Sequence, residues 1–382
     1  MTIGLKANND GSGAIQVNGV DRATVDTNGV LTVPAGISVP NSFGFKNRII
    51  NGGMVIDQRN NGASVTPTAG QYTLDRWQLG ITVSSKVSVQ QNAGSVTPPT
   101  GFSNYLGVTS TSAYSLVAGD RIGLFQPIEG FNTADLGWGA VGAQSITMSF
   151  WVRSSLTGTF GGVVANGAYN RAYVYSYTIN AANTWEYKTV TIPGDTTGSW
   201  LTNNSTGIAV SWAVGVHSGL QGTPGSWSGT AAFAPTGQVN VAGTNGATFY
   251  ITGVQLEKGS TATSFDYRPY GTELQLCQRY FEMSYDIGTA IGSVGSLGMF
   301  SSIRSNGLGG TSLGFKVTKR AVPTVTAYSP ATGTAGTGRD YGAGTERAVT
   351  LESVGSSTFT IVMGAAAVSA AFGIQWAAAI EL

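Results

Sequence analysis

The chain has 382 residues, enough for two or three domains of about 150 residues each. It carries 55 glycines, and only 10% of its residues are charged, against about 25% in ordinary soluble domains. One histidine (His217), one cysteine (Cys277) and a net charge of +1 exclude histidine-rich metal sites, internal disulfides and the basic footprint of a nucleic-acid binder. We therefore expect no cofactor, no metal site and no nucleic-acid partner.

Residues 1–45 predict short strands separated by tight turns. Asn18-Gly19 and Asn28-Gly29 are dipeptides typical of two-residue hairpin turns. The segment has too few large apolar side chains for a core of its own, so association of several chains would have to supply one. Met1–Lys6 is not followed by an apolar stretch, and we therefore expect no signal peptide and synthesis in a cytoplasm.

Residues 46–270 predict an antiparallel, jelly-roll-like β-sandwich. Side chains alternate with a period of two through five segments, 146–152, 173–179, 185–192, 208–214 and 249–256. In the last segment, Phe249 and Ile251 are expected on one face, with Val254 and Leu256 on the other.

Two long loops are expected between these strands, at Thr157–Asn170 and Gly215–Gly246. Both are rich in glycine, asparagine or threonine. Because ligands commonly bind to long loops on a rigid β framework, these loops are candidate binding regions.

Residues 271–286 predict one helix. Leu274, Cys277, Phe281 and Tyr285 recur at three- and four-residue spacing after Thr272, a suitable N-cap. A single short helix must dock on another element, which would be either the sandwich or symmetry copies of the helix itself.

Residues 287–382 predict a small C-terminal β domain, so that the fold class as a whole is all-β. Strands are expected at Pro323–Tyr328 and in a C-terminal hairpin formed by 359–363 and 372–376. The stretch Met363–Ile380 has the minimal length of a membrane span. It is rich in alanine and glycine and lacks a basic flank, which favours the packed hairpin over membrane insertion.

Two passages resemble parts of a known family. The first, NRIINGGMVIDQRNNG (Asn47–Gly62) with YTLDRWQL (Tyr72–Leu79), is similar to the opening of a β-sandwich domain in bacteriophage tail fibre and tailspike-like proteins. Asp57 stands where the commoner form has an aromatic residue. The second, Gln255–Glu282, resembles the end of that domain, where an ATxFxYRPYGxELxxCQRYF passage leads into a helix. The N-terminal repeats and the C-terminal segment are also similar to parts of such fibres.

This resemblance implies a homotrimeric virion fibre that is made in the host cytoplasm. Its N-terminal segment would attach to other tail or capsid proteins of the virion. Its sandwich would be similar to carbohydrate-binding modules and would attach the particle to a host-surface polysaccharide. Two alternatives stay open: a tailspike depolymerase that cleaves such a polysaccharide, and a purely architectural fibre.

Candidate sugar-binding residues are loop aromatics near amide groups, because a ring packs against the C–H face of a pyranose while amides meet its hydroxyls. The candidates are Trp138, Tyr169, Asn170, Trp200 and Trp227 in the sandwich and Tyr341 in the C-terminal domain. The residues expected to form the structural framework are Asp75, Arg76, Trp77, Arg268 and Arg279, with Asp75 and Arg76 as a buried pair under the Trp77 indole.

Glycan hydrolysis would need two carboxylates flanking a sugar cleft. Asp135, Asp195 and Asp340 lie in expected loops, but their spacing places no two of them together. The chain also lacks the 20- to 30-residue repeat of a β-helix, the usual depolymerase scaffold. We therefore expect no catalytic residues and no enzyme, and no role for His217 beyond that of an exposed loop residue.

Overall fold

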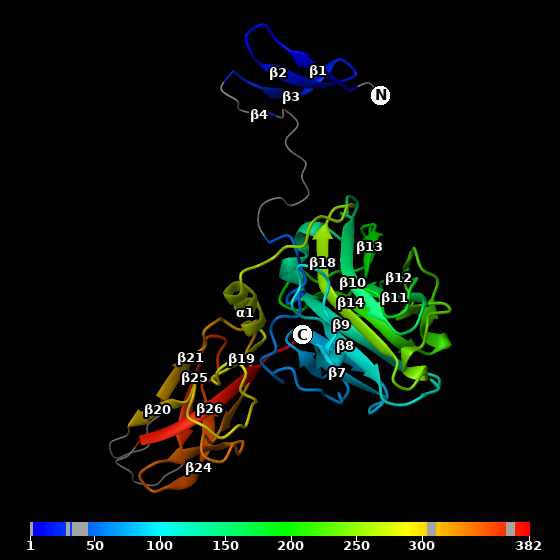
Figure 1. The fold of residues 1–382 in the computed structure, drawn as a ribbon. Coiled ribbons are helices and arrows are strands. Elements are labelled where there is room, and N and C mark those ends of the chain that lie inside the picture. The colour runs from blue at the N-terminus through cyan, green and yellow to red at the C-terminus, as the bar shows by residue number, and fades with distance from the viewer. Residues whose placement is uncertain (1–2, 28–30, 33–44, 304–310, 364–370) are drawn as a thin grey trace. The chain divides into compact units, whose positions relative to one another are not determined.

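The computed structural model describes residues 3–27, 31–32, 45–303, 311–363 and 371–382. The chain divides into two compact units, Met1–Gly44 and Phe45–Leu382. The described residues form antiparallel sheets almost throughout, with one α-helix, α1 (Tyr270–Gln278) (Figure 1). The all-β fold class is thereby confirmed.

The first unit contains one antiparallel sheet, in the order β1 (Ile3–Ala7), β2 (Gly13–Val17), β3 (Val20–Val25) and β4 (Leu31–Thr32). Asn18 and Gly19 join β2 to β3 with φ angles of 52° and 79°. Two successive positive φ angles are what a type I′ hairpin turn requires, so this predicted turn is confirmed. The second predicted turn, Asn28-Gly29, lies outside the described residues.

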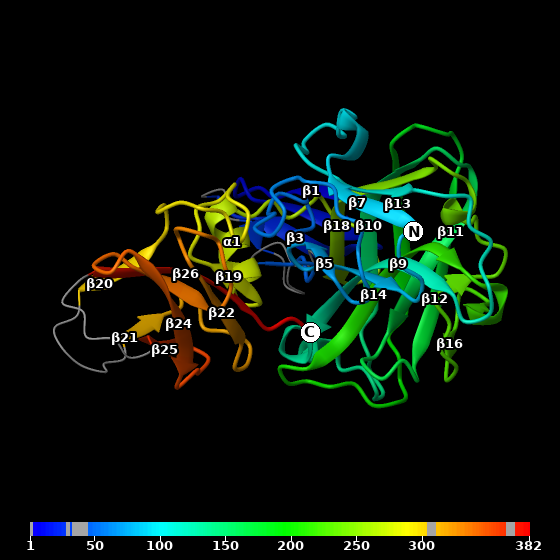
Figure 2. The same ribbon diagram turned by 90° about the horizontal axis from the view of Figure 1, so that it is seen from below.

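The second unit begins with a sandwich of two sheets that stack face to face (Figure 2). The five-stranded sheet has the order β13 (Glu186–Ile192), β10 (Ile146–Ser154), β18 (Thr248–Lys258), β8 (Leu106–Ser110), β7 (Val87–Gln91). The seven-stranded sheet has the order β16 (Trp227–Ser228), β12 (Ala172–Ile179), β11 (Gly158–Ala165), β14 (Thr206–Val216), β9 (Arg121–Glu129), β6 (Trp77–Ile81), β5 (Tyr72–Leu74).

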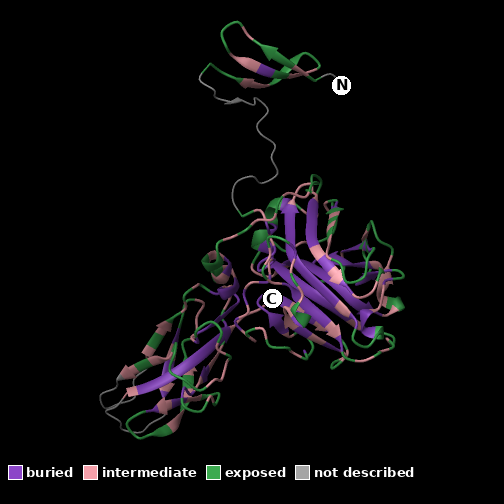
Figure 3. Cartoon of the chain, viewed as in Figure 1, coloured by how far each residue is buried: buried purple, intermediate pink, exposed green. Residues whose placement is uncertain are grey.

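The sandwich core lies between these two sheets, and buried residues run along nearly the full length of the central strands (Figure 3). Trp77 and Phe150 both pack on Trp212, with ring centroids 5.4 Å and 5.8 Å away. These three rings come from both sheets and are fully buried, so they connect the two layers directly.

The prediction for the two faces of β18 is wrong. Phe249, Ile251, Val254 and Leu256 are all fully buried in the same core. Between the two pairs, β18 contains one residue more than the neighbouring β10, and Gly253 there has a φ of 60°. This β-bulge shifts the alternation by one position, which turns the second pair back toward the core.

The loop predicted at Thr157–Asn170 is also wrong for most of its length, because it contains strand β11. A side chain at Gly161 or Gly162 would collide with the backbone oxygens of Tyr175 and Ser211 on the two adjacent strands. Glycine therefore marks close strand packing here and not a turn. The loop predicted at 215–246 holds only short pieces, which include the parallel pair β15 (Gln221–Gly222) and β17 (Ala234–Pro235).

Helix α1 is shorter than the 271–286 prediction. It begins after Pro269 and not after Thr272, and it ends at Gln278. The chain then continues as strand β19 (Phe281–Met283). Phe281, Met283 and Tyr285 are buried together, so they follow a strand period of two that coincides in part with the helical spacing. Cys277 packs against Ile50 and Ile56, which docks the helix on the opening segment of the sandwich.

The C-terminal part from β19 onward, which we call the tip, is a second β structure. Its sheet order is β19, β26 (Ala371–Ala379), β23 (Thr337–Asp340), β24 (Thr345–Glu352), β25 (Thr358–Met363), β21 (Thr311–Gly314), and β20 (Phe300–Ile303) and β22 (Thr324–Tyr328) also pair with β26.

The predicted C-terminal hairpin is wrong, because β25 and β26 do not pair. Strands β23 and β24 lie between them, and β26 is a central strand that bonds to four others. No helix among the described residues is both long and apolar enough to span a membrane.

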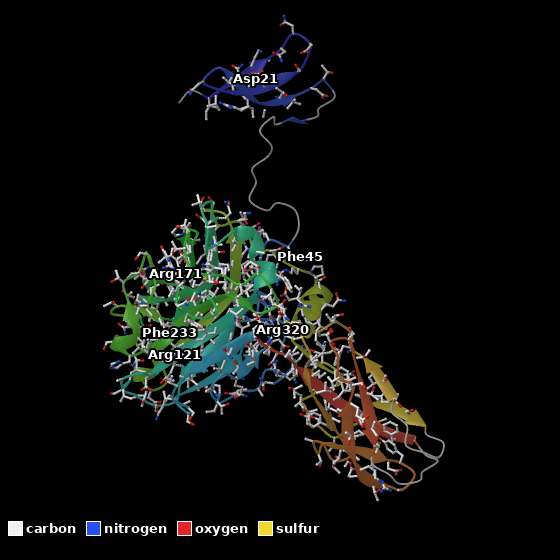
Figure 4. All side chains as sticks on the ribbon, turned by 180° about the vertical axis from the view of Figure 1, so that it is seen from behind. Asp21, Phe45, Arg121, Arg171, Phe233 and Arg320 are labelled. Atoms are coloured by element: carbon white, nitrogen blue, oxygen red, sulfur yellow. The ribbon has the colours of Figure 1, made fainter. Side chains whose placement is uncertain are left out.

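Ion pairs and backbone contacts connect the tip to the sandwich. Glu381 at the end of the chain pairs with Arg59 and Arg76 of the sandwich. Arg320, labelled in Figure 4, donates to the backbone oxygens of Asn204, Ile380 and Glu381. The last residues of the tip are therefore anchored on the sandwich.

Candidate ligand-binding site

Three of the predicted sugar-binding residues come together. Trp138, Trp200 and Trp227, which we call the Trp cluster, have ring centroids 4.6 to 5.4 Å apart and interplanar angles of 76° to 81°. Each ring thus meets its neighbours edge to face, and the cluster packs against the sandwich core. Sugars stack on an open ring face, and this arrangement covers much of the face area.

The polar atoms of the Trp cluster are all used within the protein. The three indole N–H groups donate to the backbone oxygens of Gln144, Thr197 and Pro193. The hollow beside Trp138 and Trp200 measures only about 50 Å³. The cluster therefore has the properties of a small secondary core packed against the main core of the sandwich.

The amide residues next to the Trp cluster are bonded to one another. Asn166 donates to the side chain of Asn170 at 2.7 Å and to the backbone oxygen of Ser199 at 3.0 Å. Arg171, labelled in Figure 4, holds the buried Asp195 through two bonds of 2.7 Å. These contacts fix the loops around the cluster.

The other two predicted ligand residues lie elsewhere. Tyr169 has a φ of 54° and packs on Phe233 with ring centroids 5.5 Å apart. Tyr341 is an exposed residue of the tip, and its hydroxyl contacts the sulfur of Met299. The six predicted residues therefore do not form one site.

The loop carboxylates each have a partner of their own. Asp135 pairs with Arg48 and Lys258, and its pKa lies below the usual value because these cations outweigh partial burial. Burial opposes the charge of Asp195, but Arg171 and Thr197 hold its pKa below the usual value.

Asp340 accepts bonds from the backbone N–H groups of Ala343 and Gly342 and also contacts Arg347. The backbone bond from Ala343 is the main cause of its lowered pKa. His217 is half-buried, and its ring also has a local partner, since it accepts a hydrogen bond from the backbone N–H of Gly219.

In the predicted framework, the expected pair between Asp75 and Arg76 is not the one formed. Asp75 accepts bonds of 2.7 Å from the backbone and the side chain of Gln58. Arg76 instead pairs with Glu381, and its guanidinium lies 3.6 Å from the Tyr280 ring centroid. A positive φ of 69° at Arg76 turns its side chain away from that of its neighbour.

The other framework residues also make buried contacts. The Trp77 indole donates to the backbone oxygen of Asn51 at 3.0 Å. Arg279 binds Glu129 through two bonds of 2.8 and 2.9 Å. Lys319, which the sequence analysis did not single out, is fully buried with Glu282.

Arg268 differs from these residues because it borders an open space. We call this space the Tyr267 hollow; it measures about 130 Å³ and is lined by Gly53, Val55, Gly101, Phe102, Ser103, Phe265, Tyr267, Arg268 and Glu273. Three aromatic rings form its wall, with centroids 5.0 Å apart for Phe102 and Phe265, 4.9 Å for Phe265 and Tyr267, and 5.7 Å for Phe102 and Tyr267. Tyr267 is 61% exposed.

The polar side of the Tyr267 hollow is a buried charge cluster. The side chain of Arg268 is only 3% exposed and donates to the backbone oxygens of Ile49 and Asn47 and to Glu273. Its Nε atom makes no hydrogen bond with any described residue, and the nearest carboxylate, that of Asp266, is 3.7 Å away. One buried donor thus remains unpaired beside the aromatic wall.

Arg268 is one of the predicted framework residues, but the sequence does not predict the hollow beside it. Phe102 comes from a loop before β8, whereas Phe265 and Tyr267 follow β18. Only the pairing of β8 with β18 brings these loops together. The only local signal is the Phe-x-Tyr pair at 265 and 267, and a tight turn between these residues, closed by a bond of 3.1 Å from the Tyr267 N–H to the Phe265 backbone oxygen, brings the two rings together.

No family model matches the chain, and no curated protein matches it. Among solved structures, the enzymatically active domain of tailspike protein 4 of bacteriophage CBA120 aligns with 56% of this chain and 21% of its own, at 12% identity and a TM-score of 0.31. A carbohydrate-binding module, TmCBM61 in complex with β-1,4-galactotriose, aligns over 56% of this chain and 99% of its own, at 13% identity and a TM-score of 0.29.

A family 11 carbohydrate-binding module from Clostridium thermocellum, in complex with a β-1,3-1,4-mixed-linked tetrasaccharide, aligns over 53% of this chain and 98% of its own, at 14% identity and a TM-score of 0.27. The chain spans about a fifth of the tailspike domain's length. The identities and TM-scores are all low, so this likeness adds nothing to the assignment of function.

Proposed function

We propose that this protein is a virion fibre that attaches a bacteriophage to its host by binding a surface glycan through the sandwich. The observation that carries glycan binding is the Tyr267 hollow, where an exposed aromatic ring lies beside a buried, incompletely bonded guanidinium. Ligand sites commonly combine an apolar wall with a few fixed polar groups in this way. The resemblance of the passage through Tyr267 to phage fibres supports the proposed setting.

The test of glycan binding is retention of the purified full chain by host-derived polysaccharide. We expect purified capsule or lipopolysaccharide of a susceptible strain to retain the protein, and excess soluble protein to block phage adsorption. Absence of both effects would leave the architectural alternative as the better account.

The proposed fibre is a homotrimer, and the first unit supports self-association. Its strands place six apolar side chains on one face, at Ile3, Leu5, Ile15, Val17, Ala23 and Val25. Leu5 is 87% exposed and Ile3 66%, and Ala14 is the one buried residue among those described in this unit. A sheet with an apolar face needs a second layer to cover it, and copies of the same sheet would supply one.

Light scattering during size-exclusion chromatography tests this association. The 39.3 kDa chain should elute with the mass of a trimer. Leu5→Glu should lower that mass, whereas Lys6→Glu, on the opposite face of the same strand, should leave it unchanged. A monomeric wild type would contradict the proposal.

We further propose that the chain binds glycans without hydrolysing them. A glycosidase needs one carboxyl group whose pKa is raised so that it can act as the general acid. The pKa values of Asp135, Asp195 and Asp340 are all lowered by their own partners, and Asp75, whose pKa burial raises to about 6, is fully buried with both oxygens bonded to Gln58. New reducing ends after incubation with host polysaccharide would contradict this proposal and favour the depolymerase alternative.

A further inference from the structure

The volume, the aromatic wall and the charge of the Tyr267 hollow together indicate which kind of sugar it can bind. We propose that it binds one neutral hexopyranose ring, such as a chain end or side branch of the host polysaccharide. This inference rests on the proposed glycan-binding function and adds to it the site, the size and the charge of the sugar.

The size of the hollow limits the ligand to about one ring. Its volume is about 130 Å³, whereas pockets for drug-sized ligands measure about 300–1,000 Å³. A long groove for several sugar units in a row would need more space. A single terminal or branching unit can enter such a hollow while the rest of the polymer stays in solvent.

The wall of the hollow suits the C–H face of a pyranose. Tyr267 is 61% exposed although Phe102 and Phe265 hold it in place. Gly101 permits this position, because a side chain there would put its Cβ 2.6 Å from the Tyr267 hydroxyl oxygen. The wall is thus a preformed flat surface with an amphipathic ring at its rim.

The polar groups of the hollow suit hydroxyls. Glu273 lines the hollow with a carboxylate that can accept a hydrogen bond from a sugar hydroxyl, and the buried guanidinium of Arg268 lies beside it. The Ser103 hydroxyl lies on the exposed rim. A sugar with several hydroxyls could therefore donate a hydrogen bond to Glu273 and bond to the Ser103 hydroxyl at the same time.

The charges beside the hollow disfavour an acidic sugar. The single cation Arg268 is paired with two carboxylates, those of Asp266 and Glu273. The cluster thus has a net charge of about −1, and a uronic acid would bring a second negative charge close to it. A neutral sugar has no such cost.

Gly53 offers a direct way to block the hollow. A Cβ built on Gly53 meets nothing closer than 3.8 Å, so a side chain there fits the backbone and extends into the open space. Gly314 in β21 of the tip also has free space around it and serves as the matched control. Gly53→Leu and Gly314→Leu therefore add the same side chain inside and outside the proposed site.

The experiment measures binding of four neutral methyl hexopyranosides, of gluco, galacto, manno and N-acetylgluco configuration, to the full chain by saturation-transfer NMR. We expect a Kd on the order of 1 mM for at least one of them. Gly53→Leu and Tyr267→Ala should each weaken it at least about tenfold, Tyr267→Phe and Gly314→Leu should retain it, and methyl glucuronide should bind at least about tenfold more weakly.

The outcomes separate this inference from the proposed function. If host polysaccharide binds the wild type and Gly53→Leu equally well, the glycan-binding function stands and this site is wrong. If the polysaccharide is retained but none of the four glycosides binds, the single-ring inference is wrong. Equal affinity for the glucuronide would overturn the charge argument. If neither polysaccharide nor glycoside binds, the proposed function itself fails.

Discussion

The Trp cluster and the Tyr267 hollow are both built from three aromatic rings of the sandwich, and all of these except Trp227, in the short strand β16, come from loops. In the Trp cluster, every indole N–H already donates to a backbone oxygen, and the rings cover one another edge to face. Beside the Tyr267 hollow, one ring is largely exposed and a buried donor is unpaired. Loop aromatics therefore indicate a ligand site only where their faces and the neighbouring polar atoms remain available.

The largest loss of stability is expected at Lys319, a buried cation that is hydrogen-bonded, whereas Arg268 Nε has no partner among the described residues. Lys319 donates to the backbone oxygen of Gln278 and to Glu282, and both charged side chains are completely buried. Lys319→Met would leave the Glu282 carboxylate without its cation, at a cost of about 3–5 kcal/mol in the free energy of unfolding.

Chemical denaturation of the two variants Lys319→Met and Lys319→Met/Glu282→Leu measures this effect. The double variant should recover most of the lost stability, because it removes both charges together. If Lys319→Met is as stable as the wild type, the hydrogen bonds of a buried charge do not show that it stabilises the fold. Lys319 could then not be contrasted with Arg268 on that basis.

A pH-dependent effect is expected from Asp75, whose oxygens are occupied by Gln58. Burial raises its pKa to about 6 in the folded protein, although Arg59 and the Gln58 donors act against this. The ordinary value is 3.8, so the folded state binds the proton more tightly. The contribution of Asp75 to stability is therefore greatest below pH 4 and falls, by about 3 kcal/mol, as the pH rises to 6.

Asp75→Asn removes this titration while keeping the shape of the side chain. The stability of the variant relative to the wild type should rise between pH 4 and pH 6 and then level off. Denaturation at one-unit pH intervals measures it, with Asp57→Asn as a control at a partly exposed aspartate whose oxygens accept backbone bonds. A constant difference between Asp75→Asn and the wild type would argue against a titrating Asp75.

Much of the fold follows from the sequence, because one buried face per strand gives a period of two. Alternation placed β10, β12, β13, β14 and β18 near their observed bounds. It failed at β11, where Gly161 and Gly162 replace the expected apolar side chains. It also failed after Gln278, where Phe281 and Tyr285 fit both a helix and a strand.

The candidate site was harder to predict for a different physical reason. Composition shows that an aromatic residue occurs in a loop, but not whether its N–H group or its ring face is already occupied. The sequence alone therefore does not distinguish Trp138 from Tyr267, because the difference lies in the residues that surround each ring in space. Those neighbours depend on strand pairing between distant segments, as for Phe102 and Phe265.

A moderate effect is expected for the Trp cluster itself. Trp138→Ala removes a half-buried indole that contacts two other indoles, and we expect a loss of about 2 kcal/mol in the free energy of unfolding. Because the cluster acts as a secondary core, binding of polysaccharide by the folded variant should stay at the wild-type level. A Trp138→Ala variant that folds normally but no longer binds polysaccharide would indicate that the ligand binds at the Trp cluster.

The smallest effect on stability is expected at Tyr267, where the effect on binding should be largest. With 61% of the residue exposed and its hydroxyl not bonded to any described residue, Tyr267→Ala should change the free energy of unfolding by about 0.5 kcal/mol or less. Denaturation and glycoside binding measured on the same sample compare the two roles directly. Tyr267→Ala should then lose affinity and keep its stability, whereas Trp138→Ala should lose stability and keep its affinity. A loss of stability at Tyr267 as great as that at Trp138 would mean that both aromatic trios serve the fold.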